Sequence, residues 1–296
     1  MRRSPRMVLL LTLSLLSAMV CAADEAPPRY HVLISNDDGV DAPGIEALVA
    51  AVAADPAYRV TVVAPASNQS AKGHALNIEG LLEVRRHDPV SGCEAWAVGG
   101  TPATSVRVAL TGILADDPPD LVLSGVNRGE NCGRIAWYSG TVGAAREAVL
   151  AGVPAIAFSL QLDWSDPKPD YPAAAGWAKG VVDAVRRHGL PSGVLLNVNL
   201  PRDPATTRGY RLARMGLAPD RVNRYELDRE EGGTRWFRSR WAPPEEHTPG
   251  ADTRELEQGW VTVVPLGLDQ TAFEALPGLL EMDFAPPGPA AVSAGP

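Results

Sequence analysis

Side chains that carry oxygen gather in three short polar segments of this sequence, and each segment directly follows an apolar run. The first segment holds adjacent carboxylates at Asp37 and Asp38, the second a hydroxyl at Ser70, and the third an amide at Asn127. Carboxylate, hydroxyl and amide oxygens are hard donors, which suit Mg²⁺, Mn²⁺ or Ca²⁺ rather than zinc or copper. Two adjacent acids that face one crevice repel each other, and a cation relieves that repulsion. The pattern therefore predicts a divalent-cation site.

The adjacent acids also have a simpler interpretation. An Asp-Asp-Gly sequence is common in turns and at helix N-termini, because Asp side chains accept hydrogen bonds from nearby backbone N–H groups. Taken alone, Asp37-Asp38-Gly39 is more typical of such a turn. The other two oxygen-bearing segments favour the metal interpretation, provided that the fold brings all three together.

A fourth polar segment, Tyr138 to Gly143, leads into a predicted helix. Small residues at a helix N-terminus present free backbone N–H groups to an anion, and Ser139 and Thr141 could add hydroxyl donors. An ordinary Ser/Thr N-cap accounts for the same residues equally well. His74 follows the Ser70 segment, and a structural role is the favoured interpretation for it.

The segments that position these side chains alternate between strand and helix patterns. Short apolar runs predict strands over Tyr30–Ser35, Arg59–Ala64, Leu81–Arg86, Glu94–Val98, Asp120–Ser124, Pro154–Ser159, Gly193–Asn199 and Trp260–Pro265. Apolar residues at helical spacing predict helices over Pro43–Ala54, Pro102–Ala115 (with Thr101 as N-cap), Thr141–Ala151 and Tyr171–His188. This alternation predicts an α/β fold with a mostly parallel sheet and helices on both faces. The carboxyl ends of parallel strands share one edge, so we expect the polar segments to meet there.

The composition is that of an acidic globular protein. The 296 residues are 45% hydrophobic and 21% charged, and the formal net charge is -8. No basic stripe is present, so we expect no binding to duplex nucleic acid as the main role. The sequence also lacks GxGxxG, GxxxxGK[ST], HExxH and GxSxG, which argues against dinucleotide oxidoreductases, P-loop NTPases, zincins and α/β-hydrolases.

The N-terminus has the pattern of a secretory signal peptide. Arginines precede an apolar run over Met7–Leu16, and Ala22 and Ala23 fit a cleavage site. The run is too short for a comfortable membrane span. We therefore expect residues 1–23 to be removed, no stable membrane anchor, and an exported, periplasmic protein. An uncleaved anchor or a lipoprotein on Cys21 is the lesser alternative.

The pattern changes toward the C-terminus. Residues 205–258 are polar and rich in Arg, Glu and Gly, which predicts an irregular or hairpin-bearing extension. Residues 285–296 are expected to form a disordered tail. After cleavage, Cys93 and Cys132 remain; they could pair in an oxidising compartment, although buried or free thiols are favoured.

The order of these motifs resembles that of the SurE family, the survival-protein 5'/3'-nucleotidases that are also described as acid phosphatases. The matching segments of this sequence are Ile34–Val40, Pro43–Ile45, Val62–Pro65, Gln69–Ala71 with Gly73, Gly100–Ala103, Pro119–Asn131, Tyr138–Val142, Leu196–Pro201 and Val261–Leu266 with Asp269 and Thr271. The likeness runs from about residue 30 to about residue 280. The number and order of the motifs argue against chance agreement.

The resemblance implies a Rossmann-like phosphatase domain over residues 24–284. Within it, residues from about 205 to 258 would exchange contacts between the subunits of a homodimer or homotetramer. The resemblance implies one divalent cation per subunit, Mg²⁺ or Mn²⁺, on Asp37, Asp38, Ser70 and Asn127. It also implies that the substrate phosphate is held by the Ser139-Gly140-Thr141 loop, with Asn36 beside it.

Two positions depart from the family pattern. Ala66 stands where the family usually has an acid, and Ile135 where it often has Asp or Asn. Neither position is an expected metal ligand, so these departures bear on substrate preference more than on activity. An export signal is also less usual for the family, and it would direct the activity toward nucleotides outside the cytoplasm.

These observations together predict a metal-dependent phosphomonoesterase that hydrolyses nucleoside monophosphates to nucleoside and phosphate. Asp37 or Asp38 would orient or deprotonate an attacking water, and direct attack by one of these carboxylates through an aspartyl-phosphate is the second mechanism. The alternatives are a non-catalytic envelope protein that binds nucleotides, and a phosphatase whose main substrate is a short polyphosphate or a sugar phosphate. The preferred base and the choice between 5' and 3' phosphates stay open.

Overall fold

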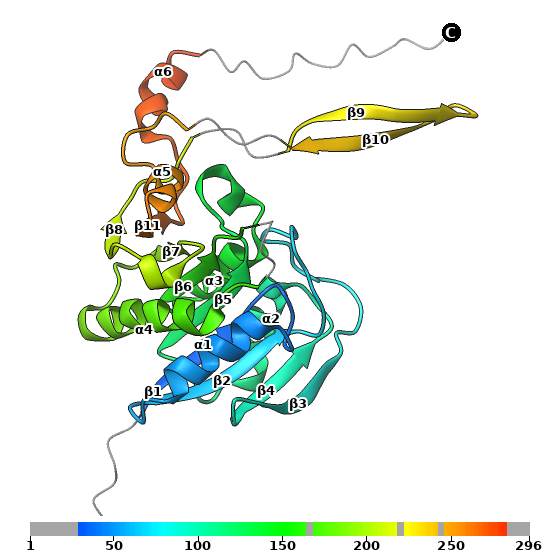
Figure 1. Cartoon of the computed structure of the whole chain (residues 1–296). Coiled ribbons are helices and arrows are strands. Elements are labelled where there is room, and N and C mark those ends of the chain that lie inside the picture. Colours follow the sequence, from blue (N-terminus) through cyan, green and yellow to red (C-terminus); the bar gives the residue numbers. More distant parts are fainter. Residues whose placement is uncertain (1–28, 164–167, 218–221, 242–245, 283–296) are drawn as a thin grey trace, which may run out of the picture.

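The centre of the molecule is a nine-stranded sheet (Figure 1). Its strands are β1 (Tyr30–Ser35), β2 (Tyr58–Pro65), β3 (Val84–Val90), β4 (Cys93–Val98), β5 (Leu121–Arg128), β6 (Ala155–Leu160), β7 (Val194–Leu200), β8 (Tyr210–Leu212) and β11 (Val261–Gly267). The order across the sheet is β3-β4-β2-β1-β5-β6-β7-β11-β8. The strands from β4 to β7 are parallel to one another, while β3 and β11 run antiparallel to β4 and β7. The α/β class predicted from the sequence is confirmed.

This computed structural model describes residues 29–163, 168–217, 222–241 and 246–282. The expected signal peptide over residues 1–23 and the expected tail over residues 285–296 lie outside these ranges. Within them, no helix combines the length and the hydropathy that a membrane span requires.

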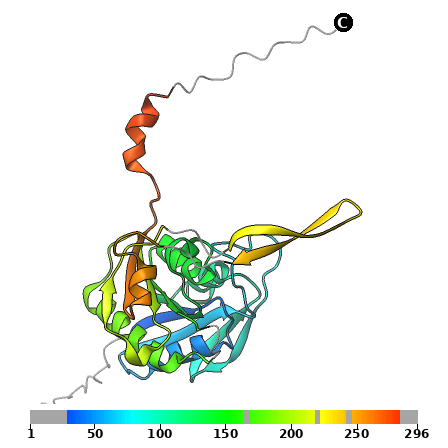
Figure 2. The same ribbon diagram turned by 45° about the horizontal axis from the view of Figure 1, so that its top comes forward.

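Helices cover both faces of the sheet. Helices α1 (Pro43–Ala53) and α4 (Tyr171–His188) pack on one face, and α2 (Pro102–Val108) and α3 (Gly140–Leu150) pack on the other. Helix α5 (Asp252–Glu257) contacts β11 and β7, whereas α6 (Leu276–Leu280) has no buried residue and projects away from the sheet (Figure 2). Alternate residues of a strand point to opposite faces, and β1 shows this clearly. Val32 and Ile34 pack in one core cluster with residues of α1 and α4, whereas Leu33 packs in a second cluster with residues of α2 and α3. The buried strand therefore has two hydrophobic faces, as a parallel sheet requires.

Local sequence signals explain where the long helices begin and end. Helix α1 has Pro at its first position, where a missing N–H costs little. The N-cap of helix α4 is Asp170, whose side chain accepts a hydrogen bond from Ala173 N at 3.0 Å. It ends with basic residues in its last turn, which favour the negative end of the helix dipole.

Three elements differ from the sequence prediction. The predicted strand Asp120–Ser124 continues to Arg128, because a register shift lets the chain re-pair with β6 at Asn127. Gly125 allows this path with a φ of 134°, a value that side chains rarely tolerate. The predicted strand Leu81–Arg86 is displaced to Val84–Val90, where it forms a hairpin with β4. Helix α2 ends at Val108, and the chain continues as a π-helical turn over Ala109–Ile113.

The polar C-terminal region contains a β-hairpin, as one of the two expected forms. Strands β9 (Val222–Glu231) and β10 (Thr234–Trp241) pair with each other and project away from the body of the molecule (Figure 2). Gly232 and Gly233 connect them with φ values of 58° and 80°, the left-handed region that tight hairpin turns favour. Helix α6, beyond the last predicted strand, was not expected.

Candidate active site

Three segments that are distant in the sequence meet at the carboxyl ends of β1, β2 and β5. The backbone oxygen of Asp37 accepts a hydrogen bond from the N–H of Gln69 at 2.7 Å. The Asp38 carboxylate accepts one from the N–H of Arg128 at 3.0 Å and one from the Asn68 side chain at 3.3 Å. Each contact joins a residue of the acidic segment to the immediate neighbourhood of Ser70 or Asn127. The expected meeting of the three segments at one sheet edge is therefore observed.

Asp37 is a buried acid held by helix α3. Its side chain is 3% exposed, and the Thr141 hydroxyl donates a hydrogen bond to its Oδ1 at 2.5 Å. Burial raises the pKa of Asp37 to about 6, and the nearby charge of Asp38 acts in the same direction, while hydrogen bonds from Thr141 oppose the shift. Near neutral pH the ionised carboxylate is therefore poorly hydrated, and a bound cation would stabilise its negative charge.

Asp38 lies beside Asp37 but is less enclosed. Burial raises its pKa, and a hydrogen bond from the Arg128 backbone opposes that shift. The two adjacent acids thus share one direction of pKa shift for the same reason, which is loss of water around the charge. Such paired, desolvated carboxylates are typical of metal-binding and catalytic sites.

Asn127 and Ser70, the other two expected ligands, differ in how they are placed. The amide nitrogen of Asn127 donates to Gly129 O at 2.7 Å, so its Oδ1 is the end that can face a cation. Asn127 is 8% exposed and stands at the end of β5 rather than in a loop. Ser70 is exposed, and its own N–H donates to Asn68 Oδ1 at 3.0 Å. Asn68 therefore connects Ser70 to Asp38.

The residues present fit a hard divalent cation better than a softer one. In the described part of the chain, no group of three or more His, Cys, Asp or Glu side chains is placed to hold a metal. A cation here would depend on two carboxylates supplemented by amide and hydroxyl oxygens, which is a donor set that suits Mg²⁺ or Mn²⁺. Cys93 and Cys132, the cysteines of the described residues, are both free thiols.

Helix α3 directs its N-terminus at Asp37. Ser139 is a true N-cap, because its hydroxyl accepts a hydrogen bond from Val142 N at 3.1 Å. Gly140 follows, and a Cβ there would lie 2.9 Å from Asp37 Cβ and 3.1 Å from Pro102 Cγ. Only glycine lets the helix start approach the acid this closely. The helix dipole and the first N–H groups then favour negative charge at this point.

Asn36 is fully buried and shapes the acidic segment. Its amide nitrogen donates to Gly39 O at 2.7 Å, and its Oδ1 accepts from Gly39 N at 3.2 Å. These paired bonds close the turn that presents Asp37 and Asp38. Contact between Asn36 and a phosphate stays a prediction.

A cleft of about 400 Å³ opens beside Asp38. Its lining includes Asp38, Pro43, Ala66, Asn68, Arg128 and Tyr171. Its volume is within the range of small-molecule sites. One of the two departures from the family pattern, Ala66, thus lies in the wall of this cleft.

The structure also shows supporting residues that had no expected role, although most of them lie in the segments that match the family pattern. Asn131 is 5% exposed and joins the segment after β5 to two further strands. Its N–H donates to Asn199 Oδ1 at 2.7 Å, its side chain to Ser159 Oγ at 2.8 Å, and its carbonyl accepts from Asn197 Nδ2 at 2.9 Å. Asn and Ser in the middle of otherwise apolar strands were the signal that could have identified this network.

Comparisons with known proteins agree on one family. A family model described as "Survival protein SurE" matches residues 32–221. Similar curated proteins include "5'-nucleotidase SurE 1" of Thermus thermophilus, 41% identical over 85% of this chain and 98% of that protein. "5'-nucleotidase SurE" of Methylococcus capsulatus is 39% identical over 83% of this chain and 94% of that protein. The crystal structure of the SurE protein from Aquifex aeolicus superimposes with a TM-score of 0.72 at 32% identity, covering 84% of this chain and 98% of that one.

Proposed function

The chain belongs to the SurE family, and on that premise we propose that it is a divalent-metal-dependent nucleotidase that hydrolyses nucleoside monophosphates. The observation that carries the proposal is the junction of Asp37, Asp38 and the α3 N-terminus. There, paired desolvated carboxylates adjoin backbone N–H groups that favour an anion. Curated relatives that carry the name 5'-nucleotidase support the same reaction class.

In this reaction, the residues of the chain would have distinct roles. Asp37, Asp38, Ser70 and Asn127 would hold one Mg²⁺ or Mn²⁺, which supplies neutralisation of charge on the phosphate. The first N–H groups of α3 and the Ser139 hydroxyl would bind phosphate oxygens, while the Thr141 hydroxyl, which was also an expected phosphate donor, instead donates to Asp37. Asp37 or Asp38 would orient the attacking water and accept its proton as the P–O bond to the nucleoside breaks. The leaving alkoxide takes up a proton, and nucleoside and phosphate are released.

Attack by one of the two carboxylates on phosphorus is the competing mechanism. It would form an aspartyl-phosphate that water then hydrolyses. Rapid acid quenching during turnover of ³²P-labelled AMP distinguishes the two mechanisms. Protein that retains the label would overturn the direct-water mechanism. Unlabelled protein, together with phosphate release that shows no initial burst, would support the direct-water mechanism.

The main experiment measures phosphate release from AMP by the mature chain. The protein is stripped with a chelator, assayed, and assayed again after Mg²⁺ or Mn²⁺ is restored. We expect activity only with metal, and we expect Asp38→Ala to lose it under every condition. Asp117→Ala is the matched control, because Asp117 lies in the loop before β5 with a side chain 61% exposed, paired with Arg59. It should retain activity.

Other outcomes would favour the alternatives. AMP binding without phosphate release would indicate a non-catalytic nucleotide-binding protein. Faster release from short polyphosphate or a sugar phosphate than from any nucleotide would indicate a different main substrate. Assays with 2'-, 3'- and 5'-AMP decide which phosphate position is accepted.

The cleft beside Asp38 is our proposed place for the nucleoside. Its volume of about 400 Å³ suits a small molecule, and Ala66 leaves room in its wall. Ala66→Trp should raise the KM for AMP several-fold while leaving hydrolysis of acetyl phosphate, which carries no nucleoside, nearly unchanged. An equal loss for both substrates would place the nucleoside elsewhere.

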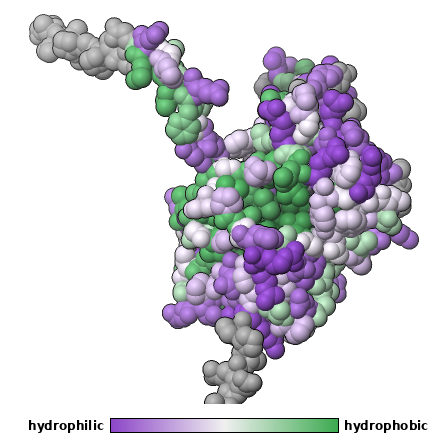
Figure 3. Space-filling view, turned by 90° about the vertical axis from the view of Figure 1, so that its left-hand side faces the viewer, coloured by the Kyte–Doolittle hydropathy of each residue, from purple (hydrophilic) through white to green (hydrophobic). Residues whose placement is uncertain are grey.

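Export to the periplasm and assembly into a homodimer or homotetramer are also part of the proposal. An N-terminal sequence of the secreted protein that starts near Ala22 would support export, and an intact N-terminus on the purified chain would contradict it. Support for assembly comes from a groove of about 490 Å³ whose lining includes Val181, Val185, Leu196, Tyr210 and Val263. Figure 3 shows apolar side chains gathered on that side of the molecule.

A further inference from the structure

The Ser70 segment is the least constrained part of the proposed cation site. This segment, Ser67–Gly73, belongs to residues 66–83, which connect β2 to β3 without a helix or strand. Long irregular segments need specific contacts to hold one conformation. On the N-terminal side of Ser70, the hydrogen bond from Gln69 N to Asp37 O gives one such contact. Contacts on its C-terminal side decide whether the Ser70 hydroxyl stays in place.

Helix α3 supplies the closest of those contacts. Gly73 N donates to Tyr138 O at 3.0 Å, immediately before the N-cap of the helix. A side chain at Gly143 would collide with the Gly73 carbonyl oxygen, so the helix backbone and the segment pack directly against each other. The same helix that directs its N-terminus at Asp37 therefore also supports the Ser70 segment.

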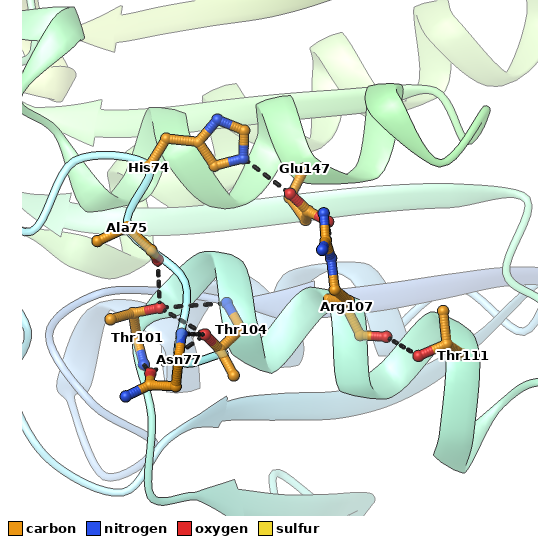
Figure 4. A network of polar contacts seen from close by, with 8 residues as sticks. All are labelled: His74, Ala75, Asn77, Thr101, Thr104, Arg107, Thr111 and Glu147. Carbon is orange, nitrogen blue, oxygen red and sulfur yellow. Dashed lines mark hydrogen bonds and ion pairs between the residues drawn. The ribbon is translucent and has the colours of Figure 1, made fainter. Parts of the chain in front are cut away.

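A charged contact reinforces this packing. His74 Nε2 lies 2.8 Å from Glu147 Oε2, and Arg107 Nε donates to Glu147 Oε1 at 2.5 Å (Figure 4). The Glu147 side chain is 3% exposed, while His74 and Arg107 are 23% and 50% exposed. Burial alone would raise the pKa of Glu147, but hydrogen bonds from His74 and Arg107 bring it below the ordinary value. Glu147 is thus a buried charge with a partner on each oxygen, and such pairs are geometrically demanding.

The chain beyond His74 is fixed to helix α2. The Thr101 hydroxyl donates to Ala75 O at 2.6 Å, and Asn77 N donates to Thr104 Oγ1 at 2.9 Å (Figure 4). Arg107 belongs to the same helix. The Ser70 segment is therefore held by α2 and α3 at once, and Glu147 connects all three.

We propose that His74, Glu147 and Arg107 form a positioning unit that holds the Ser70 segment against α3 and so sets the geometry of the cation site. The inference rests on the proposed metal-dependent function, because the site to be positioned is the proposed one. His74 and Glu147 act through Ser70 and touch neither substrate nor cation. A purely structural role would lower stability and leave the cation affinity of the folded protein unchanged.

The experiment measures Mn²⁺ affinity of the full mature chain by electron paramagnetic resonance, at a temperature where circular dichroism shows every variant folded. His74→Ala and Glu147→Ala should each weaken Mn²⁺ binding roughly tenfold or more, the range seen when residues that orient metal ligands are removed. His74→Gln, whose amide can still donate to Glu147, should restore most of the affinity. Because the two residues act as one unit, the double variant His74→Ala/Glu147→Ala should have an Mn²⁺ affinity no lower than that of the single variant with the lower affinity.

Tyr58→Phe is the matched control. It removes a hydrogen bond of 2.6 Å from Tyr58 to the Asp183 carboxylate, between β2 and α4 and away from the Ser70 segment. It should change the unfolding temperature without changing Mn²⁺ affinity. Unchanged Mn²⁺ affinity in folded His74→Ala would overturn the positioning role while leaving the metal site intact. Absence of Mn²⁺ binding by the wild type, with Asp38→Ala indistinguishable from it, would overturn the metal site and the positioning role together.

Discussion

At the scale of single residues, the site contains a group that destabilises the folded protein, and the rest of the fold must offset this free-energy cost. Asp37 is a nearly fully buried carboxylate next to a second acid. Hydrogen bonds from the hydroxyl and the backbone of Thr141 do not fully replace the water that Asp37 loses on folding. The metal-free protein therefore carries a destabilising charge at neutral pH, in the way that functional sites often do.

The pH dependence of stability follows from this charge. The folded pKa of Asp37, about 6, lies above its ordinary value of 3.8, so the folded state binds the proton more tightly. Stability from this group is present below about pH 4 and is lost as pH rises through about 6. In chelator-treated protein at pH 7.5, Asp37→Asn should raise the free energy of unfolding by up to about 3 kcal/mol, at about 1.4 kcal/mol per pKa unit. Urea unfolding at pH 7.5 and pH 4.5 measures it.

The advantage of Asp37→Asn should be small at pH 4.5, where the wild-type acid is largely protonated in the fold. Asn keeps an acceptor for the Thr141 hydroxyl, so the substitution removes charge with little loss of hydrogen bonding. Equal stability of the two proteins at pH 7.5 would show that the buried charge is compensated in some other way. Asp41→Asn, at an exposed position, should have no comparable effect.

Gly140 offers a steric prediction at the same place. A Cβ would lie 2.9 Å from Asp37 Cβ and 3.0 Å from its Oδ2, so Gly140→Ala must displace either the acid or the helix start. We expect a loss of about 1 to 3 kcal/mol in stability and at least tenfold weaker Mn²⁺ binding, measured by thermal unfolding and titration. Gly176→Ala, in α4 with nothing within 4 Å of the new Cβ, should instead stabilise slightly. If Gly140→Ala and Gly176→Ala had the same effect on stability and on Mn²⁺ binding, the close approach of Gly140 to Asp37 would have no energetic consequence.

At the scale of elements, most of the fold could be predicted because its patterns are local. Helix α4 has the predicted bounds, Tyr171–His188, since an N-cap, an apolar stripe and a basic last turn agree. The continuation of β5 to Arg128 could not be predicted, because it depends on how β6 re-pairs after a register shift. Likewise, residue types predicted that Asp37 and Asp38 act together, but not that Thr141 and Gly140 would enclose Asp37.

The attachment of the C-terminal region to the sheet could not be predicted either. It depends on Asp252, a buried acid at the start of α5. Its carboxylate accepts hydrogen bonds from Gly133 N at 2.9 Å, Gly216 N at 3.0 Å and Thr253 N at 2.9 Å. One side chain thus joins residues that follow β5 to residues that precede the hairpin, and no pattern in the sequence around Asp252 predicts this role.

Removal of that carboxylate should loosen the C-terminal region. Asp252→Ala leaves buried N–H groups without acceptors, each worth about 1 to 3 kcal/mol, so we expect a total loss of several kcal/mol. Limited proteolysis should cut the variant within residues 205–258 faster than the wild type. Asp228→Ala, which removes the hairpin partner of Arg238 at an exposed ion pair, should stay within about 0.5 kcal/mol of the wild type. Equal cleavage rates for Asp252→Ala and the wild type would contradict the anchoring role.

At the scale of the whole molecule, large apolar side chains remain uncovered around the C-terminal elements. Leu212 is 81% exposed on β8, and Leu280 is 87% exposed on α6. Leu212 pairs in register with Val263, which lines the 490 Å³ groove. Exposed apolar area of this kind marks surfaces that bind other proteins, in agreement with the proposed homo-oligomer.

Leu212→Glu tests that assembly. A charge placed in an apolar interface should weaken association, so light scattering should give a lower mass than for the wild type at equal concentration. Leu150→Glu, at a 56% exposed position where α3 ends, should keep the wild-type mass. A wild-type protein that is monomeric at all concentrations would refute the expected assembly directly.

Strand β3, at one edge of the nine-stranded sheet, has a further consequence for how copies of the chain meet. An open edge strand is a template onto which another chain can add and begin aggregation. Arg85 and Arg86 are exposed on β3, Pro89 has no N–H to offer, and pairing with β4 shifts register between His87 and Val90. Positive charge, a missing donor and irregular geometry each disfavour an added strand. Strand addition at the β3 edge is thereby disfavoured, so that contacts made there between copies of the chain would depend on side chains rather than on a continued sheet.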